Sequence, residues 1–158
     1  MAYHKPLTLT FQVKVPQVVV CKALAVEDMA DCASVLEEKE KASFSPVIYE
    51  YFTKGFLGFG AYVDNQMVGY VFIKKPKERP ETLSVVRKKW RNLGVATSLR
   101  NFAIEQSKKD LVGEFVYSAT ELWNNASLTS LLNSGYEVTA ITGEGTTSQF
   151  IQLRRAIK

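Results

Sequence analysis

The sequence predicts one domain with a mixed α/β (α+β) fold. Its 158 residues are within the roughly 100–200 residues of a typical domain, and 46% of them are hydrophobic, which is enough for a sizeable core. Segments with the two-residue period of strands alternate along the chain with segments of helical period. Because no repeat, linker or break in composition divides the chain, we expect residues 1–158 to form one domain, with residues 1–16 as an N-terminal extension.

Two strands and a helix are expected first. Residues 7–15 alternate apolar and polar side chains, which predicts a half-buried strand that ends at Pro16. The β-branched run 17–24 predicts a second strand. In residues 25–38 apolar side chains recur at helical spacing and acidic residues lie in the first turn, as in an amphipathic helix. The expected buried face of this helix consists of Val26, Met29, Ala33 and Leu36.

A short helix and a hairpin follow. Residues 47–54 can form a short helix that Gly55 would end. The two apolar, aromatic-rich runs 57–63 and 67–73 flank residues 64–66, whose sequence Asp-Asn-Gln suits a tight reversal of the chain. These runs therefore predict a β-hairpin.

The second half of the chain continues the mixed order. A basic, proline-containing loop at 74–80 leads into an expected strand at 81–86. A helix is expected over 94–109 because Val95, Leu99, Phe102 and Ala103 recur at helical spacing. The remaining expected elements are a strand at 114–119, a helix at 124–134 closed by Gly135, and strands at 136–142 and 148–155.

Charge and composition exclude several classes of protein. The net charge of +4 suits an anionic small ligand or a nucleic acid. No run approaches the roughly 18 apolar residues of a membrane span, and the N-terminus lacks the apolar stretch of a signal peptide, so we expect a cytoplasmic protein. Cys21, Cys32 and the single histidine, His4, have no zinc-ligand spacing, so no metal is expected.

The segment between the strand 81–86 and the helix 94–109 is suited to binding phosphate. N–H groups in the first turn of a helix lack intrahelical partners and lie at the positive end of the helix dipole, so they can bind a pyrophosphate. Gly94 and Ala96 would permit its close approach. The turn, residues 91–96, matches neither the Walker A motif nor the dinucleotide motif G-x-G-x-x-G, which disfavours ATP and NAD.

This turn resembles the acetyl-CoA-binding motif of the GNAT superfamily of N-acyltransferases, Arg/Gln-x-x-Gly-x-Gly/Ala, with Arg91, Gly94 and Ala96 at its defined positions. The order of elements over residues 17–155 is also similar to that family. The resemblance implies a mostly antiparallel central sheet flanked by helices, to which the N-terminal strand would be an addition.

The activity implied by the resemblance is transfer of the acetyl group of acetyl-CoA directly to a primary amine of an unidentified acceptor. Such an enzyme needs acetyl-CoA and the amine as partners, no metal and no membrane, and the family's habit allows a homodimer. The acceptor pocket would include Tyr49, Tyr51, Phe52 and Phe56, which either pack or face the substrate.

The resemblance also assigns roles to residues. Val86 would lie where its strand separates from a neighbour, bind the pantetheine arm, and donate its N–H to the oxyanion, while Glu81 would be the base. Position 131, where many members carry a tyrosine acid, is Leu131 here; Tyr117 and Tyr136 are candidate replacements that fit apolar packing as well. The expected cofactor-binding residues are Val86, Arg91, Asn92, Leu93, Gly94, Val95, Ala96, Thr97 and Asn124.

Two alternatives remain open at this point. The basic segment 87–91 (RKKWR) combines four cations with Trp90, a pattern that also suits a nucleic-acid-binding module. The absence of a tyrosine at position 131 also suits a catalytically weak acyl-CoA-binding sensor.

Overall fold

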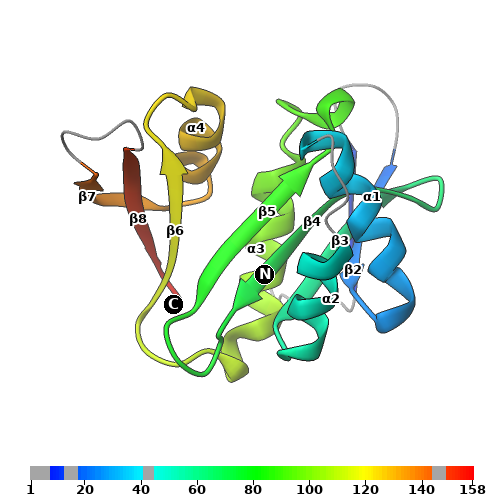
Figure 1. Ribbon diagram of the computed structural model, residues 1–158, viewed down its shortest axis with the longest axis horizontal. Coiled ribbons are helices and arrows are strands. Elements are labelled where there is room, and N and C mark those ends of the chain that lie inside the picture. Colours follow the sequence, from blue (N-terminus) through cyan, green and yellow to red (C-terminus); the bar gives the residue numbers. More distant parts are fainter. Residues whose placement is uncertain (1–7, 13–17, 41–44, 144–148) are drawn as a thin grey trace, which may run out of the picture.

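A computed structural model describes residues 8–12, 18–40, 45–143 and 149–158. Within these ranges eight strands form one sheet in the order β1-β2-β3-β4-β5-β6-β8-β7 (Figure 1). The strands are β1 (Thr8–Gln12), β2 (Val18–Ala23), β3 (Leu57–Val63), β4 (Gln66–Lys74), β5 (Glu81–Val86), β6 (Phe115–Glu121), β7 (Glu137–Thr142) and β8 (Phe150–Ala156).

Helices cover both faces of this sheet (Figure 1). The α-helices are α1 (Met29–Glu40), α2 (Ser45–Thr53), α3 (Val95–Ser107) and α4 (Asn125–Asn133), and the short 3-10 helices are η1 (Val26–Asp28), η2 (Lys88–Trp90) and η3 (Lys108–Asp110). Buried residues of α1 and α2 pack with one face of β4, and those of α3 pack with the other face. The sheet is therefore the middle layer of three.

The sequence of strand β4 is a continuous apolar run because both faces of this strand are buried. Successive side chains on a strand point to opposite faces, so Tyr70 and Phe72 face α1 and α2 while Val71 and Ile73 face α3. All four are fully buried. The hairpin formed by β3 and β4 turns at Asp64 and Asn65. Both residues have positive φ, as a tight two-residue turn requires.

Strands β5 and β6 join the two halves of the sheet. All other neighbouring strands pair antiparallel, whereas β5 and β6 are parallel and connected through α3. Their register has one Cα pair, Glu81 with Tyr117. Figure 1 shows the two strands together at this end and apart at the other, where α4 lies beside β6. The carboxyl end of β5 thus has a neighbouring strand on the β4 side alone within the described residues.

The structure confirms the mixed fold and the predicted strands and helices within the described ranges, including the added strand β1. One prediction was wrong: Val26 is 65% exposed because it lies in η1, and α1 begins only at Met29. The face of α1 that is buried consists of Cys32, Ala33, Val35 and Leu36. Pro16 and the ends of three predicted strands (residues 7, 13–15, 17 and 148) lie outside the described residues.

Two negative findings apply to the described ranges. No helix there is long and apolar enough to cross a membrane. No group of three or more His, Cys, Asp or Glu side chains in these ranges could hold a metal ion.

Candidate functional site

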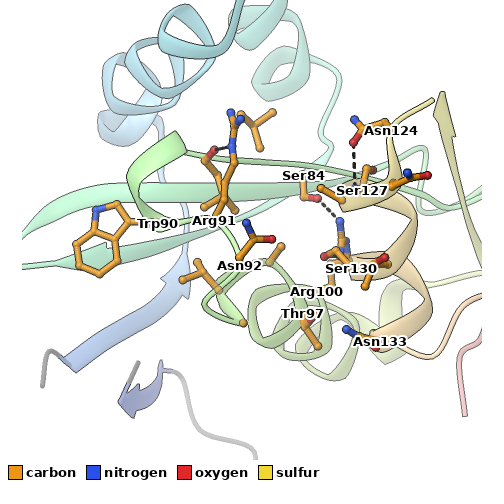
Figure 2. A pocket seen from close by; sticks show the side chains of 18 of the residues that line it. Ser84, Trp90, Arg91, Asn92, Thr97, Arg100, Asn124, Ser127, Ser130 and Asn133 are labelled. Carbon is orange, nitrogen blue, oxygen red and sulfur yellow. Dashed lines mark hydrogen bonds between the residues drawn. The ribbon is translucent and has the colours of Figure 1, made fainter. Parts of the chain in front are cut away.

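A cavity of about 620 Å³ lies where β5 and β6 have separated (Figure 2). Its walls are the last three residues of β5, the turn and first helical turns that follow, Asn124 with one face of α4, and Lys39 of α1. These segments are far apart in sequence, but they line the same cavity because the two strands have separated.

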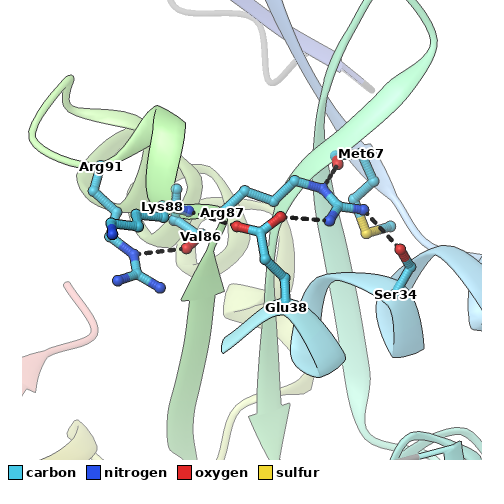
Figure 3. Close-up of polar contacts among 7 residues, drawn as sticks. All are labelled: Ser34, Glu38, Met67, Val86, Arg87, Lys88 and Arg91. Atoms are coloured by element: carbon cyan, nitrogen blue, oxygen red, sulfur yellow. Dashed lines mark hydrogen bonds and ion pairs between the residues drawn. The ribbon is translucent and has the colours of Figure 1, made fainter. Parts of the chain in front are cut away.

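The backbone of Val86 faces this gap. The Arg87 N–H donates to the Val68 carbonyl oxygen on β4 at 2.8 Å, and neighbouring peptide groups on a strand point to opposite sides. The Val86 N–H therefore points away from β4. Its carbonyl oxygen accepts from Arg91 Nε at 2.9 Å (Figure 3), which agrees with this orientation. The strand thus offers an N–H donor at the cavity wall.

The turn before α3 presents further donors. Gly94 is the N-cap of α3 with φ of +83°, and it has no side chain to cap the first helical turn. The Ser98 N–H makes the first helical bond, to the Gly94 carbonyl oxygen at 3.0 Å, so the N–H groups of residues 95–97 lack intrahelical partners. Val95, Ala96 and Thr97 all line the cavity. This is the geometry of an anion-binding helix N-terminus.

Arg91 is the basic residue of the turn that faces the cavity. Arg91 Nε donates to the Val86 carbonyl oxygen at the end of β5. In the described part of the chain the two terminal nitrogens of Arg91 have no ion pair or hydrogen bond, and Arg91 lines the cavity. Asn92 also lines the cavity, with φ of +62°, whereas Leu93 packs against the core and does not line it.

Arg87 has a structural role (Figure 3). Its Nη1 contacts Glu38 Oε2 at 2.8 Å, its Nη2 donates to Ser34 Oγ at 3.0 Å, and its Nε donates to the Met67 carbonyl oxygen at 2.8 Å. The second Glu38 oxygen accepts the Lys88 N–H at 2.8 Å. These bonds hold the pKa of Glu38 below its ordinary value. They also fix the turn to α1, so Arg87 is not available to a phosphate.

Asn124 lines the cavity from the other side. It is the N-cap of α4, and its Oδ1 accepts the Ser127 N–H at 3.1 Å (Figure 2). Asn124 is therefore both the cap of α4 and part of the cavity wall.

Sequence analysis missed Arg100, which is only 5% exposed and lines the cavity. Its Nη1 donates to Ser130 Oγ at 2.6 Å and to Ser134 Oγ at 3.2 Å, and its Nη2 donates to Ser84 Oγ at 2.8 Å. Burial lowers the pKa of Arg100 to about 10. Arg100 is not among the four residues of the predicted apolar face of this helix, so helical spacing did not indicate its burial.

Glu81 and Tyr117 lie at the closed end of the gap and outside the cavity wall. Alternation along β5 puts Glu81 on the same face as Val85, which packs with α1 and α2. Val86 lies five positions after Glu81 in the same strand, a distance of about 16 Å along the strand. The Tyr117 ring lies 3.9 Å from the Arg79 guanidinium.

The residue at the position of the usual acid, Leu131, and the remaining candidate acid, Tyr136, are both core residues. Leu131 is 1% exposed. Tyr136 is 4% exposed, and its hydroxyl lies 2.5 Å from Thr82 Oγ1, within the sheet core. Burial is the main cause that raises the pKa of the Tyr136 phenol. Both residues pack between α4 and the sheet.

The thiols and most of the aromatic cluster are also core groups. Burial raises the pKa of both Cys21 and Cys32 to about 12, which disfavours the reactive thiolate. The rings of Tyr51 and Phe52 pack on Phe72, while Tyr49 is 59% exposed.

Comparisons with known proteins agree with this geometry. Residues 24–132 match the family model described as "Acetyltransferase (GNAT) family". No curated protein matches the sequence significantly.

Solved structures share the fold at low sequence identity. The GNAT domain of S. lividans PAT is 12% identical with a TM-score of 0.74, covering 98% of this chain and 99% of that one. The ribosomal-protein-S18-alanine N-acetyltransferase from Escherichia coli is 12% identical with a TM-score of 0.75, covering 89% and 94%. The yncA protein from Salmonella typhimurium, solved with its cofactor acetyl-CoA, is 14% identical with a TM-score of 0.71, covering 89% and 94%.

Proposed function

Because the chain belongs to the acetyltransferase (GNAT) family, we propose that it transfers the acetyl group of acetyl-CoA to a primary amine in a ternary complex. The observation that carries the proposal is the cavity between β5 and α4, which joins an unpaired strand edge to an uncapped helix N-terminus. In this proposal residues 1–158 act as one domain whose partners are acetyl-CoA and the amine.

The residues at the α3 N-terminus fit the pyrophosphate of a coenzyme A group. Three backbone N–H groups there lack helical partners, and Arg91 adds a cation at the same wall. A Cβ built on Gly94 would meet no heavy atom within 4 Å, so open space lies in front of the glycine. Asn92 and Thr97 line the same end and complete the proposed binding turn.

The edge of β5 fits the pantetheine arm and the thioester. An extended chain can bond to peptide groups that have no strand partner, as an added strand would. We assign the Val86 N–H to the thioester carbonyl oxygen, where it would stabilise the negative charge that develops during attack by the amine. Acetyl-CoA supplies the activated acyl group, and the protein supplies its position and this donor.

The amine would reach the thioester from the opposite face of the sheet. Most of the cavity wall comes from the turn before α3, α3 and α4, with Lys39 of α1 also lining it, whereas Glu81 and Tyr117 lie at the closed end of the gap and do not line it. The distance from an amine near Val86 to the Glu81 carboxylate is longer than one hydrogen bond, so the proton cannot pass directly between them. The assignment of Glu81 as base and of Tyr117 as acid therefore requires a chain of water molecules.

A catalytically weak acyl-CoA-binding sensor is the second candidate. It is favoured by the buried Leu131 at the position of the usual acid and by the distance between Glu81 and Val86. The nucleic-acid alternative loses support because Arg87 is bonded to Glu38 and Trp90 packs partly against the core.

Incubation of the protein with acetyl-CoA and a panel of primary amines tests the proposal, with products detected by mass spectrometry. The panel includes free amino acids, polyamines and peptides with free N-termini. We expect enzyme-dependent acetylation of at least one class. Binding of acetyl-CoA without acetylation of any amine would contradict catalysis and favour the sensor.

A further inference from the structure

Arg100 is a buried cation that lacks an acidic partner. It is 5% exposed, and no carboxylate of the described residues forms an ion pair with it. Burying a charge is costly unless an opposite charge or sufficient hydrogen bonds compensate for it. Three serine hydroxyls, from Ser84 on β5, Ser130 on α4 and the α4 C-cap Ser134, provide hydrogen bonds but no negative charge. Figure 2 shows Ser84 and Ser130 beside Arg100.

The cluster around Arg100 is rich in donors. A serine hydroxyl has one hydrogen to donate and two lone pairs to accept. The oxygens of Ser84 and Ser130 accept from Arg100, and within the described residues neither hydroxyl hydrogen has an acceptor. Ser134 differs because its hydroxyl donates to the Ser130 carbonyl oxygen at 2.8 Å. Nη2 of Arg100 also has a second hydrogen without a partner in these ranges.

These spare donors face one space. Ser84, Ser130 and Arg100 all line the cavity, and Ser134 does not. The three residues that carry these hydrogens therefore lie around one cavity, together with the positive charge of Arg100. Such a wall suits the two oxygens of a carboxylate, since charge-assisted hydrogen bonds to a carboxylate are the strongest that arginine makes.

The position of this cluster along β5 indicates which part of a ligand would reach it. Ser84 and Val86 lie two residues apart on one strand, about 7 Å, and alternation puts them on one face. With a thioester carbonyl at the Val86 N–H, an acetyl methyl group extends only one carbon–carbon bond, about 1.5 Å, toward Ser84. A four-carbon diacid extends three such bonds and ends in a carboxylate.

We propose that the acyl donor preferred by this site is a short dicarboxylic acyl-CoA of the succinyl class, whose free carboxylate binds Arg100, Ser84 and Ser130. The inference rests on the proposed function, because it assumes that the cavity between β5 and α4 holds an acyl-CoA. The low pKa of Arg100 fits a site in which the counter-charge arrives with the ligand.

The transfer itself is unchanged by the longer acyl group. The amine nitrogen forms a C–N bond to the thioester carbonyl carbon, and the C–S bond breaks. The amine loses one proton and the CoA thiolate gains one, so the products are an amide and CoA thiol. The distal carboxylate stays on the amide and takes no part in bond making or breaking.

Isothermal titration of the wild-type protein with acetyl-CoA and succinyl-CoA, without acceptor, tests the proposal directly. We expect succinyl-CoA to bind about tenfold more tightly or better, as one charge-assisted contact allows. Equal affinities would overturn the inference and leave the proposed function intact. Binding of neither compound would overturn both.

Substitutions at Arg100 and at a control position test whether Arg100 causes the preference for succinyl-CoA. Arg100→Gln should remove the preference for succinyl-CoA while changing acetyl-CoA affinity by less than about threefold, and Arg100→Lys should keep part of the preference because it keeps the charge. Arg155→Gln is the matched control: Arg155 also bonds to Ser134, through the carbonyl oxygen at 2.8 Å, but does not line the cavity. It should leave the preference unchanged. Equal losses for both acyl-CoAs in Arg100→Gln would assign the arginine a purely structural role and contradict the proposal.

Discussion

Glu81 on β5 and Tyr117 on β6 are paired in the single Cα register pair that joins these two strands within the described residues. Beyond this pair the strands diverge, and the Val86 end of β5 faces a cavity instead of another strand (Figure 1). The sheet is therefore most weakly joined at the same place where it opens into this cavity. Substitutions along the gap test its closed end, the Val86 N–H and the turn before α3, and a substitution of Glu38 tests the contact that fixes this turn to α1.

At the closed end, Glu81→Gln should lower kcat at neutral pH while leaving acetyl-CoA affinity unchanged, because glutamine cannot accept the amine proton. General-base catalysis is typically worth about 10²–10⁴-fold, and a water-mediated base should lie at the lower end of that range. Steady-state kinetics over a range of pH, with Glu121→Gln on the exposed part of β6 as control, measures this. Equal rates at every pH would remove Glu81 as the base.

At the cavity wall, Val86→Pro should delete the proposed oxyanion donor without breaking the β4–β5 ladder, since the Val86 N–H points away from β4. We expect kcat to fall about 10²–10³-fold, as for the loss of one oxyanion donor. Val86→Ala is the matched control because it shortens the buried side chain but keeps the N–H. If both variants lose activity equally, the side chain matters and the N–H does not.

At the open end, Gly94→Glu should abolish most acetyl-CoA affinity. The substitution puts a negative charge at the helix N-terminus and a side chain at a residue with φ of +83°. Gly113→Glu is a matched control: Gly113 has φ of +89°, a Cβ there would also meet nothing within 4 Å, and it does not line the cavity. Both variants should lose roughly 1–2 kcal/mol of stability from the left-handed backbone. Calorimetry should show weakened acetyl-CoA binding only in Gly94→Glu, and equal binding in the two variants would refute the phosphate turn.

The contact between Glu38 and Arg87 should stabilise the turn in a pH-dependent way. Since the folded state lowers the pKa of Glu38, the carboxylate contributes stability above its unfolded pKa and loses that contribution as the pH falls through the folded pKa. The carboxylate is partly exposed, so we expect Glu38→Gln to cost at most about 1 kcal/mol at pH 7. Thermal unfolding of both proteins should show a difference that shrinks below the ordinary glutamate pKa of 4.5. A difference that stays constant down to acid pH would contradict the role of this carboxylate.

Much of the fold was predictable because local patterns here agree with tertiary structure. Strand β5 begins and ends at the predicted residues 81 and 86, and Gly55 and Gly135 follow α2 and α4 with positive φ, as helix-terminating glycines do. The hairpin turn at 64–66 was similarly local. Val26 was placed wrongly because helical spacing does not distinguish the first turn of an α-helix from a preceding 3-10 turn.

The site was predictable only where a motif spans neighbouring residues. The turn 91–96 was identified from its own sequence, and five of its six residues line the cavity. The Arg100 cluster was not identified, because Ser84, Arg100 and Ser130 come from three elements and no short pattern connects them. Similarly, the register that leaves Val86 without a partner on β6 depends on how β6 joins β5, which sequence periodicity does not specify.

The central claim is that the cavity between β5 and α4 holds an acyl-CoA, and calorimetric titration of the wild-type protein with acetyl-CoA and CoA tests it most directly. ATP and a short RNA serve as control ligands. The account predicts saturable binding of one acetyl-CoA or CoA per chain, with no comparable binding of ATP. Absence of binding by both CoA compounds, together with salt-sensitive binding of the RNA, would contradict the account and assign function to the basic segment 87–91.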